Sequence, residues 1–366
     1  MINVLIIDLG RDYGGAEKVI ENLLFYDYKD INMHLVALKN TKFSSLLEKR
    51  KVKSLFIEND KKKIINSLFQ VKNYIIENKI DIIHAHGVIS EVFSLLLCKL
   101  TKCKLITTIH SRADYDTQNK IKGRAYCFIQ KKLLSCNEKY IVVSESLKEF
   151  FFKDKGIKAE KIDVIKNGIK ALEKKDNLKS STFTLSTIGR LTPVKAHKKL
   201  LEALRDLKKE GVTFKCIIAG EGELEEELKL FVAENNIGEE VKFFGFVEDI
   251  RDIFDKSDCL VIHSDMEGLP ITLLEAMSYK VPLIVYKVGG IKKVLKSNEC
   301  IELKSNEPKE ILKGIKEFIN KDKKEIEDMV NNSLINYKDN YDLDIFIKKH
   351  ELLYKEVKGE INEKFK

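Results

Sequence analysis

Short apolar runs alternate with helical patterns along the 366 residues of the chain. The helical stretches have apolar residues at core spacing, as in 195–209, where Leu200, Leu201, Leu204 and Leu207 recur. This alternation is typical of βαβ units that build a parallel sheet. We expect strands at 3–9, 33–38, 52–57, 80–84, 104–110, 139–144 and 161–165, and then at 183–188, 214–219, 241–244, 259–263 and 282–285.

A polar segment divides this pattern into two parts. Residues 171–182, ALEKKDNLKSST, have no apolar periodicity, and a new strand pattern begins directly after them. A chain of this length exceeds what one ordinary core holds. We therefore expect an α/β fold with two doubly wound, Rossmann-like domains at 1–170 and 183–340, joined by a linker at 171–182. Ligands of such sheets bind beyond the carboxyl ends of the strands, so we expect an active site in a cleft between the domains.

Composition excludes several classes of protein. With 44% hydrophobic and 33% charged residues, 18 Gly and only 4 Pro, the chain is neither disordered nor fibrous. Its seven cysteines form no CxxC pair and are typical of reduced thiols. The N-terminus has no signal-peptide pattern, and no apolar run reaches the roughly 18 residues that a membrane span needs. We therefore expect a cytoplasmic protein.

The net charge of +8 is unevenly distributed. Residues 1–170 hold 31 Lys+Arg and 20 Asp+Glu, a balance of +11, whereas residues 171–366 hold 34 and 37, a balance of −3. A basic half suits nucleic acid, an anionic membrane or a phosphorylated substrate, and it also suits a well-solvated surface. The pattern at 116–135 predicts a basic, amphipathic helix, which either lies against an anionic bilayer or packs its apolar stripe on the sheet.

The most informative motif is SDMEGLPITLLEAM at 264–277, which follows an expected strand and opens a helix. Gly268 lets the backbone approach a ligand, Pro270 suits the first helical turn, and the free N–H groups of that turn suit a phosphate. Glu267 and Glu275 could accept hydrogen bonds from different hydroxyl groups of one sugar-containing ligand. The alternative is a capped helix start with Glu275 on a solvent face.

Two further motifs lie at strand ends. In IGRLTPVKAH, 188–197, Arg190 and Lys195 are a suitable pair of cations for a diphosphate. In DLGRDYGGAE, 8–17, glycines lie between the first strand and the first helix, but they do not fit GxGxxG. Gly220 and Gly222 form only a fragment of that fingerprint, so the support for dinucleotide binding is weak.

Together these motifs resemble the GT-B glycosyltransferases of the retaining family 4, the group 1 type. The resemblance covers almost the whole chain and keeps the family's order: GGAE at 14–17, GRLTPVKAH at 189–197, GEGELEEEL at 220–228, FFGFVED at 243–249 and EGLPITLLEAM at 267–277. Glu267 and Glu275 have the spacing of the family's EX7E signature. Lys280 departs from the pattern, because the family commonly has glycine there.

The resemblance implies roles for individual residues. Arg190 and Lys195 match the basic pair that holds the donor diphosphate, Glu275 matches the acid that binds the ribose, and Glu267 matches the acid near the donor sugar. His110 matches a histidine beside the transferred sugar. The implied catalytic residues are thus His110, Arg190, Lys195 and Glu267, and the implied donor-binding residues are Gly14, Gly15, Gly189, Gly220, Gly268, Leu269, Pro270, Ile271 and Glu275, with backbone N–H groups expected from 268–271.

The resemblance also implies the reaction. We expect a retaining transfer of a hexose or N-acetylhexosamine from a nucleotide-diphosphate sugar, with UDP as the first expectation, to a saccharide or lipid-linked acceptor in cell-surface polysaccharide synthesis. We expect no cofactor, no metal requirement and no nucleic-acid partner, and either a cytoplasmic location or peripheral contact with the inner face of the cell membrane. The alternatives are a nucleotide-sugar 2-epimerase of the same architecture and a non-catalytic sugar-nucleotide-binding protein.

Two expectations concern packing. His84 and His86 in DIIHAHG sit at a strand end, where we expect a packing or polar-network role. A C-terminal helix at about 341–358 carries the apolar residues Leu343, Phe346, Ile347, Leu352 and Leu353. In the family such a helix returns to the N-terminal domain, and we expect the same here.

Overall fold

The structure is a computed structural model that describes residues 1–11, 13–50, 52–60, 63–112, 123, 125, 128, 137–155, 158–173 and 182–360. These residues form two units, one of Met1–Gly168 with Leu343–Lys366 and the other of Ile169–Asp342. The boundary follows Gly168, two residues before the limit of 170 expected from the sequence. Most of the expected helix at 116–135 and of the linker at 171–182 lies outside the described residues.

The N-terminal unit is built on a seven-stranded parallel sheet in the order β3-β2-β1-β4-β5-β6-β7. Its strands all coincide with expected ones, with ends shifted by up to two residues. They are β1 (Ile2–Asp8), β2 (Ile31–Leu38), β3 (Ser54–Ile57), β4 (Ile82–His86), β5 (Lys104–Ile109), β6 (Lys139–Val142) and β7 (Ile162–Val164). Central strands such as β1 are buried along almost their whole length, which explains why they read as continuous apolar runs.

Helices connect these strands, as the right-handed crossovers of a parallel sheet require. They are α1 (Gly15–Leu24), α2 (Lys42–Glu48), α3 (Ile64–Glu77), α4 (Val88–Thr101) and α6 (Glu145–Lys155), with a short 3₁₀ turn η2 (Ala159–Lys161). Val71 and Ile75 of α3 and Phe93 and Leu97 of α4 pack into the core beneath this part of the sheet.

The C-terminal unit has a six-stranded parallel sheet in the order β10-β9-β8-β11-β12-β13. Its strands are β8 (Thr184–Ile188), β9 (Lys215–Ala219), β10 (Val241–Gly245), β11 (Cys259–Ile262), β12 (Leu283–Tyr286) and β13 (Ile301–Leu303). We did not expect β13 from the sequence, because three residues with Glu302 exposed between two buried neighbours carry too little apolar signal.

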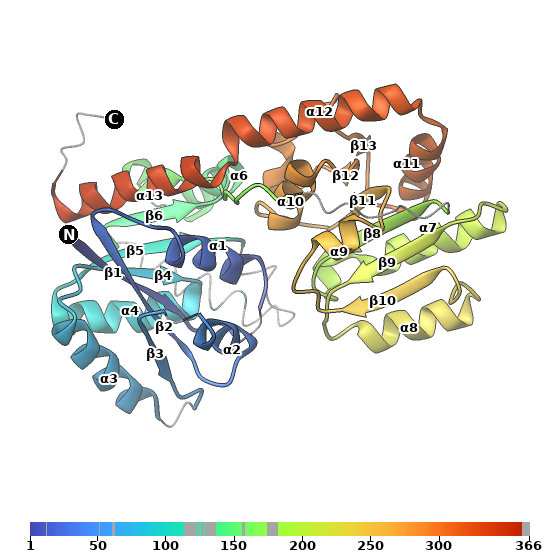
Figure 1. The fold of residues 1–366 in the computed structure, drawn as a ribbon. Coiled ribbons are helices and arrows are strands. Elements are labelled where there is room, and N and C mark those ends of the chain that lie inside the picture. Colours follow the sequence, from blue (N-terminus) through green and yellow to red (C-terminus); the bar gives the residue numbers. More distant parts are fainter. Residues whose placement is uncertain are drawn as a thin grey trace. The chain divides into compact units, whose positions relative to one another are not determined.

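Helices again link these strands, and Figure 1 labels most of them. They are α7 (His197–Lys209), α8 (Glu225–Glu234), α9 (Arg251–Phe254), α10 (Ile271–Tyr279), α11 (Pro308–Asn320) and α12 (Lys323–Asn340), with 3₁₀ turns η3 (Pro193–Lys195) and η4 (Gly289–Lys293). The helix expected at 195–209 therefore begins two residues later, and Lys195 lies in the turn before it.

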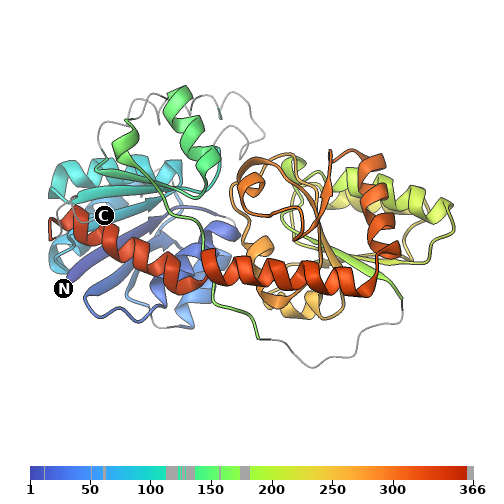
Figure 2. The same cartoon turned by 90° about the horizontal axis from the view of Figure 1, so that it is seen from above.

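The C-terminal helix α13 (Leu343–Lys358) belongs to the N-terminal unit, where it packs against β1 and β4. Figures 1 and 2 show this helix in red along the N-terminal unit. Phe346, Ile347 and Leu353 are buried, but Leu352, expected on the apolar stripe, is 47% exposed. The stripe is therefore narrower than the sequence suggested.

In each sheet the first strand in the chain is central, and later strands are added first on one side of it and then on the other, so the strand order reverses beside it. β1 pairs with β2 on one side and β4 on the other, and β8 pairs with β9 and β11. Such a reversal leaves room for a ligand beyond the carboxyl ends of the two strands where it occurs. No helix in the described part of the chain is long and apolar enough to cross a membrane.

Candidate active site

The carboxyl ends of β8 and β11 bring a cation and a carboxylate into contact. The Lys195 ammonium lies 2.6 Å from Glu267 Oε1, and Ser264 Oγ donates a hydrogen bond to the same oxygen at 2.6 Å. The Glu267 side chain is only 9% exposed and that of Lys195 20%. A charge-assisted pair with this little solvent is held in one geometry, which is what a binding site for a charged ligand needs.

The backbone places Lys195 in an unusual way. After β8 the chain passes Gly189 and Arg190 and enters η3, which ends at Ala196 with φ 54°. This is the left-handed region, which residues with a Cβ seldom adopt. The conformation turns the chain from η3 into α7, so Lys195 lies in the turn directly before the helix.

Glu267 is positioned by a second loop. The Gly290 N–H donates to the Glu267 carbonyl at 2.9 Å, and a Cβ on Gly289 would lie 2.0 Å from that same oxygen. Gly289 also has φ 54°. Only glycine fits there, because any side chain would displace the Glu267 backbone.

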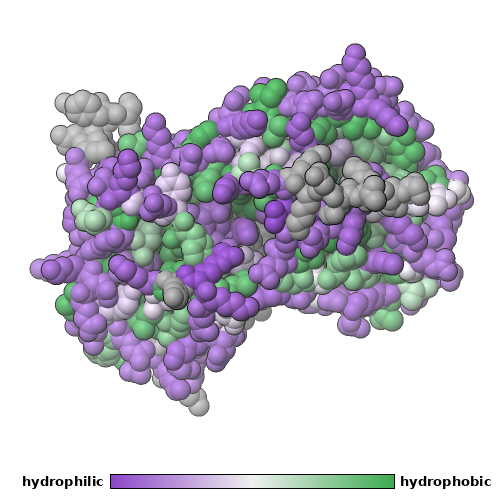
Figure 3. Space-filling model, in the orientation of Figure 1, coloured by the Kyte–Doolittle hydropathy of each residue, from purple (hydrophilic) through white to green (hydrophobic). Residues whose placement is uncertain are grey.

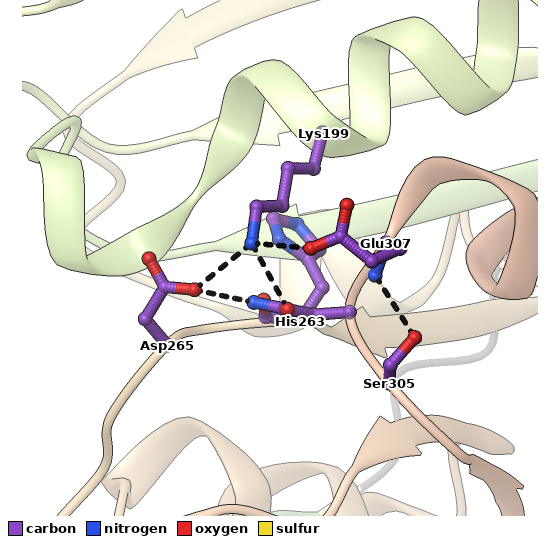
Figure 4. Close-up of polar contacts among 6 residues, drawn as sticks. Lys199, His263, Asp265, Ser305 and Glu307 are labelled. Atoms are coloured by element: carbon purple, nitrogen blue, oxygen red, sulfur yellow. Dashed lines mark hydrogen bonds and ion pairs between the residues drawn. The ribbon is translucent and has the colours of Figure 1, made fainter.

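A polar network supports the two loops from outside. Lys199 on α7 donates to Asp265 Oδ1 at 3.1 Å, to Asn306 Oδ1 at 3.0 Å and to Glu307 Oε1 at 3.1 Å. Figure 4 shows the Lys199 ammonium between the carboxylates of Asp265 and Glu307. Asn306 Nδ2 in turn donates to Asp265 Oδ1 and to the His263 carbonyl. The network therefore joins α7 to the loop that carries Glu267.

Two buried histidines lie behind Lys195 and Glu267 and line the same small pocket. His197 Nε2 donates to the Arg190 carbonyl at 3.2 Å, and His263 Nε2 lies 3.2 Å from Thr187 Oγ1. Burial lowers the pKa of His197 to about 4 and holds that of His263 well below its ordinary value. Both imidazoles are therefore neutral at pH 7, and they act as fixed dipoles in the floor of the pocket.

The helix start at 268–271 differs in one respect from the expectation. α10 begins at Ile271, with Pro270 as its N-cap. Pro270 has no N–H and cannot donate one, so the expected backbone donors at 268–271 exclude it. The first-turn N–H groups of α10 have no acceptor within the helix, and Thr272 of this turn lines the pocket with Lys195.

The remaining expected donor-binding residues of this unit have clear positions. Glu275 is buried on α10, which contradicts the alternative of a solvent-facing glutamate. The Arg190 side chain is exposed. Gly220 has φ 141°, and a Cβ there would lie 2.0 Å from the Gly189 carbonyl, so Gly220 allows the loops after β8 and β9 to approach each other.

In the N-terminal unit the glycine loop after β1 surrounds two carboxylates. Asp8 Oδ1 accepts from the Gly10 N–H at 3.2 Å, and Glu17 Oε2 accepts from the Gly14 N–H at 2.7 Å. Burial raises the pKa of Asp8 to about 6, partly offset by the Gly10 hydrogen bond. Gly14 and Gly15 thus lie at the start of α1, with Gly14 held by a residue one turn into the helix.

Histidines line the neighbouring strand ends. His86, the last residue of β4, lies opposite Asp8 of β1, and its Nδ1 is 2.9 Å from Nε2 of His110, which directly follows β5. His84 contacts Tyr354 of α13 and Thr108, each at 2.7 Å. The expected polar-network role of His84 and His86 is confirmed, and the network connects His110 to the C-terminal helix.

The surroundings of His86 fix the tautomer of His110. Burial holds the pKa of His86 well below its ordinary value and lowers that of His110 to about 4, so one proton lies between the two rings. His86 Nε2 is buried and has no hydrogen-bond partner in the described part of the chain. A buried N–H without an acceptor costs more than a bare acceptor, so the proton belongs on His86 Nδ1. His110 then carries its own proton on Nδ1.

The structure groups the expected residues into two sets. Lys195 and Glu267 meet in the C-terminal unit, near Arg190 and the start of α10, whereas His110 and the Gly14–Gly15 loop belong to the N-terminal unit. Sequence reasoning missed Ser264 as a partner of Glu267; its position three residues earlier in the same loop was the available signal. Among the described residues, no cluster of His, Cys, Asp or Glu has the makings of a metal site.

Two α/β units in which the strand order reverses, with a lysine–glutamate pair at the strand ends of one of them, define the class of a two-domain α/β protein suited to a phosphorylated ligand. Comparison with known proteins gives the family. The model of the glycosyl transferases group 1 matches residues 169–334, and that of Glycosyltransferase Family 4 matches residues 13–171. The chain therefore belongs to the GT-B glycosyltransferases of family 4.

Individual relatives agree with this assignment. The UDP-Gal:alpha-D-GlcNAc-diphosphoundecaprenol alpha-1,3-galactosyltransferase of Escherichia coli is 27% identical over 62% of this chain and 63% of its own length. The O-antigen biosynthesis glycosyltransferase WbnH of Escherichia coli is 26% identical over 81% of this chain and 85% of its own. The structure of Anabaena Alr3699/HepE in complex with UDP and glucose has a TM-score of 0.82 at 19% identity, covering 96% of this chain and 99% of that one, and shares the fold.

Proposed function

We propose that the protein transfers a hexose or N-acetylhexosamine from a UDP-sugar to a saccharide or lipid-linked acceptor in cell-surface polysaccharide synthesis. The observation that carries this proposal is the contact of Lys195 with Glu267 at the carboxyl ends of β8 and β11. A cation suited to a diphosphate thus lies beside a carboxylate suited to a sugar hydroxyl, which supports the proposal. The galactosyltransferase relative, which by its name uses UDP-Gal and a diphosphoundecaprenol-linked GlcNAc, supports the donor and acceptor classes.

The proposed chemistry assigns each group a task. As the sugar–phosphate bond breaks, negative charge builds on the departing diphosphate. Lys195, the exposed Arg190 and the first-turn N–H groups of α10 receive that charge. Glu267 binds a sugar hydroxyl, and Glu275 the ribose. Lys195 must exchange its contact with Glu267 for the phosphate, and Ser264 then remains as a donor to Glu267.

The N-terminal unit supplies the remaining groups. In the neutral tautomer derived above, His110 presents Nδ1–H as a donor to an oxygen of the transferred sugar. The loop at Gly14 and Gly15 contacts the donor phosphates and the acceptor. We propose that the acceptor attacks from the face the diphosphate leaves, so the anomeric configuration is retained. Because Arg190 and Lys195 supply basic side chains for the diphosphate, we propose that the departure of the leaving group needs no divalent metal.

A turnover assay tests the assignment. UDP release from a panel of UDP-sugars, with membrane extract as the source of acceptor, is expected to fall about a hundredfold or more in Lys195→Ala. Lys198→Ala is the matched control, because Lys198 lies three residues later, on the exposed side of α7, and pairs with Glu227. Near-normal turnover by Lys195→Ala would contradict the proposal.

Two additional measurements test the finer points. The anomeric configuration of the product, determined by NMR, is expected to match that of the donor, and inversion would exclude the retaining mechanism. Turnover is expected to be unchanged in excess EDTA, and a loss restored by Mg²⁺ or Mn²⁺ would overturn the proposed metal independence. Release of a free sugar without acceptor would identify an epimerase-type reaction instead.

A further inference from the structure

The outer faces of α3 and α4 are unusually apolar. Seven large apolar side chains on them are about half exposed or more, among them Phe69 at 54% and Leu96 at 50%. One is Ile64, the first residue of α3, and the other six are Ile65, Phe69, Ile76, Ile89, Leu96 and Leu100. We call these six residues the α3–α4 face. Figure 3 shows hydrophobic residues among hydrophilic ones over the lower left of the view, where Figure 1 labels the two helices.

Helical geometry places these side chains in two stripes. Residues 65, 69 and 76 follow one line along α3, and 89, 96 and 100 follow one line along α4. Other sides of the two helices face the core, since Val71, Ile75 and Leu97 are buried there. The two helices contact each other, so the two stripes lie on neighbouring helices of the N-terminal unit. Within the described part of the N-terminal unit, these side chains remain about half exposed or more, so no other element packs over them.

Lysines accompany the stripes. Lys72 lies on the line of Phe69 and Ile76, three residues after the first and four before the second. Lys63, Lys79, Lys99 and Lys102 are exposed at the ends of the two helices. The exposed acids in this region are Asp60, which lies in the turn with Lys63, and Glu77, while Glu91 of α4 is fully buried. Lysines therefore outnumber exposed acids around the apolar stripes, and the charge there is positive.

This charge decides which partner the face suits. A second copy of the chain packed by two-fold symmetry would bring Lys72 and its neighbours against the same lysines, which is unfavourable. An anionic lipid surface instead attracts each lysine and accepts the apolar side chains between its headgroups. The combination of apolar stripes and flanking lysines thus fits a bilayer better than a like-charged protein.

We propose that the α3–α4 face binds an anionic membrane surface, with its apolar side chains in the interfacial layer and its lysines at the headgroups. This inference rests on the lipid-linked form of the proposed acceptor, which it would place beside the N-terminal unit. The proposal does not depend on the helix expected at 116–135, which follows α4 in the chain.

Vesicle sedimentation tests the proposal with the full chain. We expect binding to vesicles containing phosphatidylglycerol and little binding to pure phosphatidylcholine. The double variant Phe69→Ser/Leu96→Ser is expected to weaken binding at least about tenfold, because each substitution removes an apolar side chain that enters the interfacial layer of the membrane. Leu230→Ser is the matched control, since Leu230 is 63% exposed on α8 beside Glu225, Glu226 and Glu227 and should leave binding unchanged.

The lysines provide a second, independent readout. Lys72→Gln/Lys99→Gln is expected to weaken binding about 25-fold at low salt, and 0.5 M salt should remove most of this difference. Equal binding to neutral vesicles, no binding at low salt, or full binding by Phe69→Ser/Leu96→Ser would overturn the proposal. A dimer in solution that Phe69→Ser/Leu96→Ser dissociates would assign the face to self-association instead.

Activity measurements separate this inference from the proposed function. Phe69→Ser/Leu96→Ser is expected to release UDP at a normal rate with a water-soluble acceptor and more slowly with a vesicle-borne acceptor. Lys195→Ala is expected to bind vesicles normally while losing turnover. Failure of vesicle binding with intact turnover would therefore contradict only the membrane face, whereas intact binding with near-normal turnover of Lys195→Ala would contradict only the catalytic assignment.

Discussion

Individual residues in this protein occupy conformations that their type disfavours, at positions next to the chemistry. Ala196 and Lys280 both adopt left-handed backbone, with φ 54° and 61°. Ala196 follows Lys195, and Lys280 ends α10, the helix that carries Glu275. Lys280 departs from the family pattern, because the family commonly has glycine there. The left-handed backbone at this position explains why glycine is preferred. Such strain persists only where the surrounding structure imposes it.

Replacing Ala196 by glycine should stabilise the protein. Ala196→Gly removes the Cβ that disfavours φ 54°, so we expect a gain of about 0.5–1 kcal/mol in the free energy of unfolding. Ala203→Gly, inside α7 and fully buried, is the control and should lose about 1 kcal/mol. Urea unfolding measures both. A destabilised Ala196→Gly would mean that η3 does not impose the left-handed turn.

His86 should determine the tautomer of His110. His86→Leu removes the Nδ1–H donor, so we expect His110 to populate both neutral tautomers, whereas His86→Asn keeps an N–H at the same place and should preserve the single one. Imidazole ¹⁵N NMR of His110 distinguishes the two forms. A single Nδ1–H tautomer in folded His86→Leu would refute this role of His86.

At the scale of elements, the loops after strands are placed by contacts far apart in the sequence. The loop with Glu267 is held by η4 through Gly289 and Gly290, by Asn306 before α11 and by Val194 of η3, whose carbonyl accepts from the Asp265 N–H at 2.8 Å. The strands were predictable because buried parallel strands are continuous apolar runs. The loop contacts were not, because nothing in the local pattern of 264–267 points to residue 289 or 306.

A methyl group at Gly289 should disturb Glu267 from outside the site. In Gly289→Ala the new Cβ would meet the Glu267 carbonyl at 2.0 Å, so the loop must move and the Lys195–Glu267 contact with it. We expect UDP-sugar turnover to fall at least tenfold, since small displacements of catalytic groups are costly. Gly211→Ala is the control, because its Cβ meets no atom within 4 Å although φ is also positive. Normal turnover by Gly289→Ala would contradict this link.

The whole molecule buries several neutral histidines in both units. Burial holds the pKa of all seven histidines below the ordinary value of 6.5, to about 4 for His110, His197 and His350; the others are His34, His84, His86 and His263. A lowered pKa in the folded state means that the unfolded chain binds the proton more readily. The stability from burying neutral imidazole is therefore complete above pH 6.5 and is lost as the pH falls towards 4.

Thermal unfolding between pH 7.5 and 4.5 checks this expectation. The Tm is expected to fall as the pH drops below 6.5. The fall in Tm per pH unit should be larger than one titrating group would cause. Asp8 acts in the opposite sense, because its pKa is raised to about 6 and its contribution is lost as the pH rises through that value. A single group of this kind cannot offset seven histidines. A Tm that is constant over this range would contradict the buried neutral state of the histidines.

The sequence by itself determined the two-domain α/β fold, nearly all of the strands, the family motifs and the basic excess of the first half. These features are local: they depend on apolar periodicity and on residue types within a few positions of one another. Only the tertiary structure decided that Ser264 and Lys195 both contact the Glu267 carboxylate and that His86 contacts His110. It also decided that α3 and α4 expose apolar stripes. Each of these depends on which side chains packing brings together or leaves uncovered, and a one-dimensional pattern does not contain that information.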